Sequence, residues 1–335
     1  MNLQSLATSL VMGAPVWMWA GFGLVVAVLL ALDLGVLHRR SREIGVRESL
    51  LTSAAYIAMG LAFGAFVWLQ LGATAGIEYL TGFVVEKSLA IDNVFVIALI
   101  FGAFAIPRSL QHRVLFWGVL GVVVLRGVMI AVGATLVTRF EWVLYLFAAF
   151  LVATGIKMLM TLNQVHDPAE GRLFKLVRRL IPMTDGLRGE RFFVREARAD
   201  GKVVRLATPM FLALVMIEIA DVIFAVDSVP AIFAITTDPF IVYTSNIFAI
   251  LGLRALYFAL AAVLHRFAYL KPALAVLLVF IGAKVFAAPL LGLEKFPPAV
   301  SLGVTFLILA TGIGWSLWKS RDGGGLASEV AGSKK

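Results

Sequence analysis

The sequence of 335 residues contains no cysteine and only four histidines. Without thiols there can be no disulfide, no thiolate metal site and no iron–sulfur cluster. Each histidine lies at the edge of an apolar run, which argues against a haem or zinc site inside those runs. The four are His38, His112, His166 and His265.

Sequence motifs of common enzymes are absent as well. The chain has no GxxxxGK[ST] phosphate-binding loop and no HExxH pair of a zinc protease. No apolar segment combines a serine with a histidine in the manner of a hydrolase. We therefore expect neither an enzymatic activity nor a bound cofactor.

Charged residues are scarce, whereas hydrophobic residues are abundant. Only 15% of the chain is charged and 61% is hydrophobic, while a soluble domain is about a quarter charged and about half apolar. No soluble fold has an interior large enough to bury so much apolar surface. The composition predicts an all-α polytopic membrane protein with the lipid bilayer as its main partner.

The net charge of +9 does not indicate a nucleic-acid partner. Lysine and arginine gather in short segments between the apolar runs, as the loops of membrane proteins do. Alternate loops, starting with residues 38–49, carry 22 basic residues, and the loops of the other side carry two. By the positive-inside rule, the N-terminus should lie outside and the C-terminus in the cytoplasm of a bacterial inner membrane.

Apolar runs of about 20 residues predict about nine membrane spans. They are Trp17–Leu37, Leu50–Leu71, Glu78–Phe104, Val114–Val137, Trp142–Leu162, Ala207–Ile235, Ile241–Leu264, Pro272–Leu290 and Pro298–Trp318. We expect a first transmembrane half over residues 1–162 and a second over 207–318. A basic cytoplasmic loop, 163–206, would join them, and a disordered cytoplasmic tail would occupy 319–335.

Eleven charged residues fall inside the predicted spans. The acids are Asp33, Glu86, Asp92, Glu218, Asp221 and Asp227, and the bases are Lys87, Arg126, Lys157, Arg254 and Lys284. Each costs roughly 2.5–3.5 kcal/mol at membrane depth on insertion scales unless it is paired or solvated. Such residues therefore indicate a functional site facing the interior of the helix bundle.

The polar residues of the two halves repeat in the same order. The third span reads EKSLAIDNVFVIALIF from Glu86, and the sixth reads DVIFAVDSVPAIFAIT from Asp221. The matched pairs are Glu86 with Asp221, Asp92 with Asp227, Asn93 with Ser228, Arg126 with Arg254, and Lys157 with Lys284. Three spans per repeat, about 78–162 and 207–290, would insert the halves in opposite orientation, as in many secondary transporters.

Helix geometry limits what one repeat can bind. Glu86 and Asn93 lie about 20° apart around a helix, whereas Asp92 lies about 120° from Glu86. A straight helix therefore cannot direct both carboxylates at one ion. Either the helix is broken, or one carboxylate binds the ion and the other pairs with a base. Pro230 favours a break in the sixth span, because it frees the carbonyl of Val226.

The polar side chains of the two repeats offer oxygen ligands: carboxylates, an amide and a hydroxyl. These ligands suit hard cations such as Mg²⁺, Ca²⁺ or Mn²⁺. The alternative is a set of buried ion pairs that only hold the helices together, and both can apply at once. Arg126, Lys157, Arg254 and Lys284 would neutralise the acids that bind no ion. Asp33 would either join an ion pathway or pair with a nearby base.

The motifs EKSLAIDNVFV, EIADVIFAVDSVPAIFAIT and NIFAILGLRALYF resemble those of the TerC family of integral membrane proteins, over about residues 15–320. The chain resembles the stand-alone form, within a superfamily of small-solute and cation exporters. The resemblance implies Mn²⁺ efflux and an association with resistance to tellurium oxyanions. Carried over by motif, the implied metal-binding residues are Glu86, Asp92, Asn93, Glu218, Asp221, Asp227 and Ser228.

These observations predict a secondary transporter that exports a divalent cation, foremost Mn²⁺, in exchange for protons. Export of an organic cation or an amino acid is the first alternative. A membrane scaffold linked to tellurium or stress resistance, with purely structural charges, is the second. An oxyanion substrate fits the motifs poorly, because oxyanions are bound by bases and helix N-termini, whereas both repeats begin with an acid.

Overall fold

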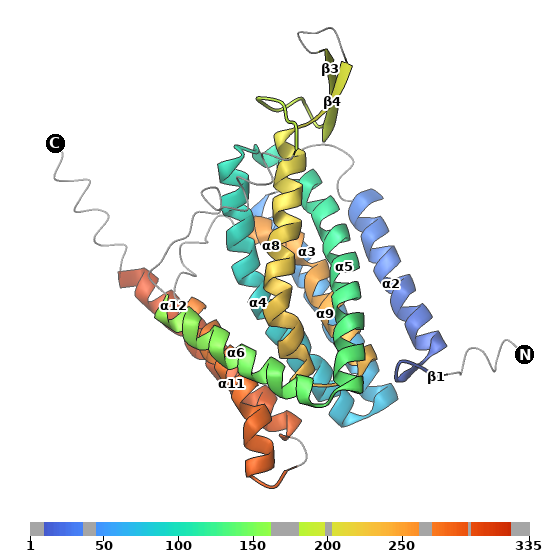
Figure 1. Cartoon of the computed structure of the whole chain (residues 1–335), viewed down its shortest axis with the longest axis vertical. Helices are drawn as coiled ribbons and strands as arrows, with labels where there is room; N and C mark the ends of the chain where they lie inside the picture. Colours follow the sequence, from blue (N-terminus) through green and yellow to red (C-terminus); the bar gives the residue numbers. More distant parts are fainter. Residues whose placement is uncertain are drawn as a thin grey trace, which may run out of the picture.

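The computed structural model describes residues 10–35, 45–161, 181–197, 203–260, 270–293 and 296–322. Helices dominate this part of the chain, which confirms the predicted fold class (Figure 1). They are α2 (Val16–Gly35), α3 (Val46–Leu71), α4 (Ala73–Ala103), α5 (Arg108–Arg139), α6 (Trp142–Met160), α8 (Pro209–Phe233), α9 (Pro239–Leu251), α10 (Leu253–Leu260), α11 (Leu270–Leu290) and α12 (Pro298–Asp322). The strands are β1 (Leu10–Val11), β2 (Ala14–Pro15), β3 (Phe193–Ala197) and β4 (Val203–Ala207).

Within the described residues, seven helical segments are long and apolar enough to cross a membrane. One of them combines α9 and α10 over Pro239–Leu260. Helices α2 and α4 lie where the first and third spans were predicted. The number of nine spans remains a prediction.

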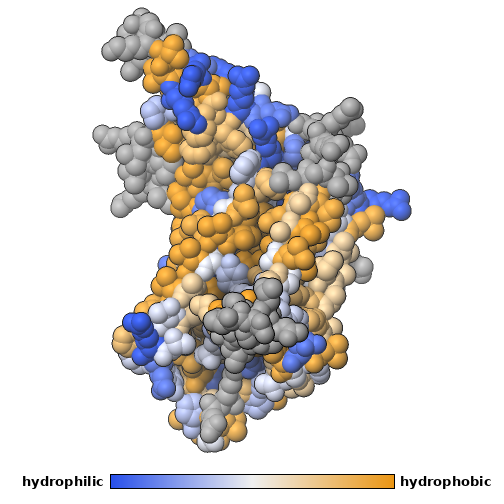
Figure 2. Space-filling view, turned by 90° about the vertical axis from the view of Figure 1, so that its right-hand side faces the viewer, coloured by the Kyte–Doolittle hydropathy of each residue, from blue (hydrophilic) through white to orange (hydrophobic). Residues whose placement is uncertain are grey.

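The packing of α5 shows how the bundle separates lipid-facing from interior residues. Val124, Val128 and Val132, one turn apart, are more than half exposed. The opposite face carries Val122 and Arg126, which are at most 2% exposed. Figure 2 shows one side of the surface, with hydrophobic residues over the middle and hydrophilic residues toward the ends. An arginine on the interior face of a membrane helix must find its partners inside the protein.

The linker between the two halves contains an antiparallel hairpin that the sequence analysis did not predict. Strands β3 and β4 pair with Phe193 opposite Ala207, and the hairpin extends beyond the end of the bundle at which α8 begins (Figure 1). The other residues of the predicted loop, 163–180 and 198–202, lie outside the described part. So does most of the predicted tail, although α12 continues through its first residues to Asp322.

The expected break in the sixth predicted span is wrong, because α8 continues through Pro230 to Phe233. Pro230 has no N–H to donate to the Val226 carbonyl, but the loss of this one hydrogen bond does not end the helix, and the Pro230 carbonyl itself accepts from Ala234 N at 3.0 Å. The seventh span is interrupted instead, since α9 ends at Leu251 and α10 begins at Leu253. Lys87 Nζ donates to the Ala249 carbonyl at 2.9 Å, which places a positive charge at the negative end of α9.

Helices α6 and α11 pack through small residues that match in the sequence. A Cβ on Gly155 would lie 2.7 Å from the carbonyl oxygen of Ala275, and one on Gly282 would lie 2.5 Å from that of Ala148. The two glycines are 127 residues apart in the chain, and so are the two alanines. Each helix therefore presents the same pair of residues to the other, and the backbones approach closely where no side chain intervenes.

Candidate functional site

Arg126 on α5 is the centre of a buried charge cluster between α4, α5, α8 and α9. The guanidinium binds Asp221 on α8 with two hydrogen bonds, from Nε to Oδ2 at 3.1 Å and from Nη2 to Oδ1 at 3.0 Å. Its Nη1 donates to Ser228 Oγ at 3.0 Å and forms a salt bridge with Glu86 on α4. Paired hydrogen bonds of this kind fix the arginine more firmly than a single contact would.

Asn246 on α9 completes this Arg126 cluster, which comprises Glu86, Arg126, Asp221, Ser228 and Asn246. Its side-chain nitrogen Nδ2 donates to Glu86 Oε2 at 3.0 Å, and its oxygen lies 3.5 Å from Arg126 Nη1. Every member is at most 5% exposed. The sequence analysis quoted the segment that contains Asn246 but gave the residue no role. Its position in a polar run of three residues, T-S-N, within a mostly apolar span was the available signal.

The spacing along α8 explains which acids meet the arginine. Asp221 and Ser228 are seven residues apart, hence on the same face of the helix, and both contact Arg126. Asp227 faces α6 instead, where Thr154 and the charge of Lys157 are its polar neighbours. The two carboxylates of this repeat therefore point to different places, and Asp221 pairs with a base. That the other carboxylate binds an ion stays a prediction.

Glu218 lies one turn before Asp221 on α8 and adds a third acid beside the cluster. It interacts electrostatically with Asp221, and it faces α5 at Gly121. Its Oε2 atom is buried and has no hydrogen-bond partner in the described part of the chain. A buried carboxylate oxygen of this kind gains stability when it binds a proton, a water molecule or a cation.

Gly121 provides the space that Glu218 occupies, which leads to a prediction. A Cβ at Gly121 would overlap the Glu218 carboxylate, the mobile end of a flexible side chain, whereas one at Gly118 would have its nearest neighbour at 3.6 Å. Gly121→Ala should displace the carboxylate while the protein remains folded, and, if the protein transports ions as proposed below, it should remove most of that transport. Gly118→Ala, one turn away, is the matched control and should keep it. Equal transport by both variants would contradict this role of Glu218.

Two predicted residues, Asp33 and Asp92, have side chains outside the described part. Asn93 is buried on α4 and Arg254 is buried on α10. Lys284 on α11 donates to Ser301 Oγ at 2.7 Å.

Among the described residues, no three histidines, cysteines or acids lie together as metal ligands. The predicted metal site therefore stays a prediction, and what the structure brings together from it is Glu86, Asp221 and Ser228 around Arg126, with Glu218 beside them.

Comparison with known proteins decides the family. The sequence model of the integral membrane protein TerC family matches residues 71–323. The chain belongs to the TerC family. A membrane protein of Myxococcus xanthus is 47% identical over 309 residues, which cover 92% of this chain and 94% of the relative. One from Rickettsia bellii is 43% identical over 295 residues, or 88% and 95% of the two chains.

A third relative of this TerC-family chain carries a functional name. It is the "Putative membrane-bound redox modulator Alx" of Escherichia coli K12, 46% identical over 306 residues, which cover 89% of this chain and 92% of the relative. No solved structure matches the chain. The family assignment agrees with the resemblance seen in the motifs.

Proposed function

We propose that this TerC-family protein is a secondary transporter that exports a divalent cation, foremost Mn²⁺, in exchange for protons. The observation that carries the proposal is the buried Glu218 oxygen without a hydrogen-bond partner beside the Arg126 cluster. A purely structural network would pair each of its polar atoms, because an unpaired one destabilises the fold. Here Glu218 Oε2 can accept a cation or a proton, and it lies beside the ion pairs of the Arg126 cluster.

The charges of the site match a divalent ion. Among the described side chains of the site, Glu86, Asp221 and Glu218 oppose a single guanidinium, that of Arg126, so that these groups carry two negative charges when fully ionised. The ammonium of Lys87 is directed away, to the end of α9. One divalent cation or two protons restore neutrality. Carboxylate oxygens and the Ser228 hydroxyl are ligands for hard cations such as Mn²⁺.

The proposed transporter has an inverted repeat, with the N-terminus outside and the C-terminus in the cytoplasm of a bacterial inner membrane. The reciprocal contact of α6 and α11 supports this arrangement, since equivalent residues meet there. In such transporters the substrate site lies between the repeats near the middle of the membrane. The Arg126 cluster joins α4 and α5 of the first repeat to α8 and α9 of the second.

The name of the Alx relative concerns redox modulation. The present chain has no cysteine, so we infer that an effect on redox state would act through the ions it moves rather than through thiol exchange. A scaffold with structural charges remains the competing function, favoured by the ion pairs of Arg126. The two functions differ in whether ions cross the membrane.

Mn²⁺ uptake by everted membrane vesicles tests the proposal. Everted vesicles accumulate what the cell exports, so vesicles with the protein should take up Mn²⁺ when their lumen is acidic, and empty vesicles should not. Because one divalent ion replaces two protons, we expect uptake to require the pH gradient and to be unaffected when valinomycin and potassium clamp the membrane potential. The absence of uptake for Mn²⁺, Mg²⁺ and Ca²⁺ alike would reject the transporter and favour the scaffold.

A further inference from the structure

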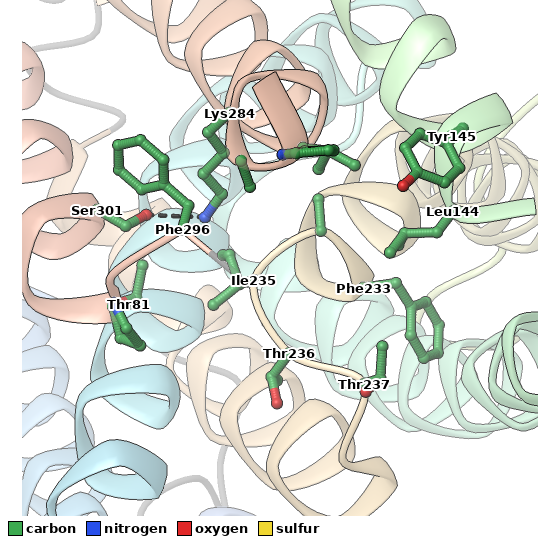
Figure 3. Close-up of a pocket in the computed structure, with 15 residues that line it drawn as sticks. Thr81, Leu144, Tyr145, Phe233, Ile235, Thr236, Thr237, Lys284, Phe296 and Ser301 are labelled. Atoms are coloured by element: carbon green, nitrogen blue, oxygen red, sulfur yellow. Dashed lines mark hydrogen bonds between the residues drawn. The ribbon is translucent and has the colours of Figure 1, made fainter. Parts of the chain in front are cut away.

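A cavity of about 220 Å³ lies between α4, α6, α11, α12 and the turn that follows α8 (Figure 3). Helix α8 begins at the β3–β4 hairpin and ends at the cavity, so the cavity lies toward the opposite end of the bundle (Figure 1). Its lining includes Thr237, which is exposed, so the cavity reaches the surface at this turn. In the proposed orientation the linker is cytoplasmic, and the cavity therefore faces the outside of the cell.

The cavity is large enough for a hydrated divalent cation. A shell of six water molecules at about 30 Å³ each occupies about 180 Å³. The side chains of Thr81, Thr236 and Ser301 contribute hydroxyl groups to the lining. These hydroxyls can form hydrogen bonds with the water around an ion.

A short stretch of protein separates the cavity from the Arg126 cluster. Thr81 lines the cavity and precedes Glu86 by five residues on α4. Phe233 lines it as well and follows Ser228 by five residues on α8. Five residues of a helix correspond to a rise of about 7.5 Å. On both helices the cavity thus begins less than two turns from the cluster.

The barrier toward the other end of the bundle is longer. Glu218, the first of the site's acids on α8, lies nine residues from Pro209 at the start of the helix, a rise of about 13 Å. Met210, Leu212 and Ala213 in this stretch are fully buried. The site is therefore closer to the outer cavity than to the cytoplasmic end of the bundle.

Two side chains from the last turn of α8 close the short outer barrier. A Cβ on Gly82 of α4 would overlap Ile232 Cδ1, and one on Gly133 of α5 would lie 2.6 Å from Phe233 Cε2. Ile232 and Phe233 are at most 3% exposed and belong to one buried apolar cluster with Val85, the neighbour of Glu86. Helix α8 thus closes against α4 and α5 where glycines leave room. A constriction lined by apolar side chains excludes water and ions.

Pro230 affects how firmly this turn is held. It has no N–H to donate to the Val226 carbonyl, so the turn that carries Ile232 and Phe233 is joined to α8 by one hydrogen bond fewer. Helices commonly bend at proline. A movement of this turn therefore breaks fewer hydrogen bonds than it would in an uninterrupted helix.

The lining of the cavity is compatible with a cation that passes through. Lys284 donates to Ser301 Oγ at 2.7 Å and has a further interaction, so its ammonium is partnered. The C-termini of α8 and α11 and the N-terminus of α12 lie at the cavity. Because the two C-termini carry partial negative charge, the helix ends on balance favour a cation. Among the described residues of the lining none is acidic, as suits a place that an ion must leave again.

We propose that this cavity is the outer vestibule through which the divalent cation leaves the Arg126 cluster, and that Ile232 and Phe233 form the gate between them. The inference rests on the proposed transport of a cation. In the present structure the gate is closed. The ion is released when the last turn of α8 moves away from Gly82 and Gly133.

The vestibule can be tested without transport, because the chain contains no cysteine and single cysteines report which positions a thiol reagent reaches. Cells that contain the full-length variants are treated with MTSET, a cation that does not cross membranes. We expect Thr81→Cys in the cavity to react and Val85→Cys beyond the gate to be protected. Val203→Cys, on the exposed part of β4, is the control for sidedness and should react only in everted vesicles. If Thr81→Cys does not react from outside, the vestibule is rejected.

Truncation of Ile232 tests the gate. Ile232→Ala, combined with Val85→Cys, should expose this cysteine to MTSET from outside, because it removes the atoms that lie over Gly82. Ile235→Ala is the matched control, since it shortens the same kind of side chain in the wall of the cavity and should leave Val85→Cys protected. Ile232→Val removes only Cδ1 and serves if the alanine variant does not fold. Equal protection with truncated Ile232 and with Ile235→Ala would overturn the gate.

The role of the vestibule in transport is tested in the same cells. After treatment with MTSET, everted vesicles are prepared and Mn²⁺ uptake is measured. The modified Thr81→Cys should lose most of the uptake of the untreated variant, and the reagent should not affect the wild type, which has no thiol. If the wild type takes up Mn²⁺ and the modified variant takes up as much as the untreated one, the exit is wrong although transport stands. If the wild type takes up none, the proposed function fails, and the exit with it.

Discussion

Replacing Arg126 with methionine is expected to destabilise the protein more than any other single substitution in the cluster. The change removes the partner of Glu86 and Asp221 and leaves two buried carboxylates without a counter-charge. Breaking a buried ion pair from one side costs about 3–5 kcal/mol. Arg126→Lys should also be destabilising, because an ammonium cannot reproduce the paired bonds to Asp221. Thermal unfolding of the detergent-purified variants, followed by size-exclusion chromatography, measures the effect.

The matched control is Arg139→Met, which removes an exposed arginine from the end of the same helix. It should unfold at the temperature of the wild type. Adding Asp221→Asn to Arg126→Met should restore part of the stability, because the second change removes one of the two uncompensated charges. If Arg126→Met is as stable as Arg139→Met, the cluster does not hold these helices together.

Replacing Glu218 with glutamine is expected to reduce Mn²⁺ uptake to the level of empty vesicles without lowering the melting temperature. The amide has the shape of the carboxylate, but it cannot gain or lose the charge that exchange of a cation for protons requires. Stability is preserved because Glu218 Oε2 forms no hydrogen bond in the described part of the chain. Uptake and thermal unfolding are measured on the same vesicle preparation.

Two further variants complete this experiment. Glu141→Gln neutralises an exposed acid at the start of α6 and should leave uptake intact. Asp221→Asn should lower both uptake and melting temperature, since it breaks the paired bonds to Arg126 as well as removing a charge. Normal uptake by Glu218→Gln would show that Glu218 takes no part in Mn²⁺ transport and would remove the main support for the proposed function.

Much of the fold could be predicted from the sequence because the bilayer restricts the possible structures. Long apolar runs can only be helices or barrel strands, and buried charges must face the interior. Arg126 follows this reasoning, since the charge on an otherwise apolar helix predicts the interior face that the structure shows. The seven-residue spacing of Asp221 and Ser228 likewise predicts a shared helix face, and both bind the arginine.

The details that the sequence did not provide depend on contacts between distant helices. Nothing local to Asn246 indicates that it bonds to Glu86, 160 residues away. The break in the seventh span arises at Gly252, where a Cβ would meet Lys87 Nζ and Tyr56 of other helices, rather than at a proline. Pro230 was misleading because a proline removes a single hydrogen bond, and whether the helix then breaks or continues depends on the packing around it, which the sequence does not define.

The contact between α6 and α11 has the same form as the interface of a symmetric homodimer. In a symmetric homodimer, residue i of one chain contacts residue j of the other, and j contacts i in return. Gly155 and Ala275 meet in this chain, as do Gly282 and Ala148, so one polypeptide contains both halves of such an interface. Two copies of one three-helix unit that pack together symmetrically would make reciprocal contacts of this kind. If the two halves descend from one such unit, its fusion into a single chain would free each copy to diverge, and Glu86 and Asp221 would be different acids at equivalent positions.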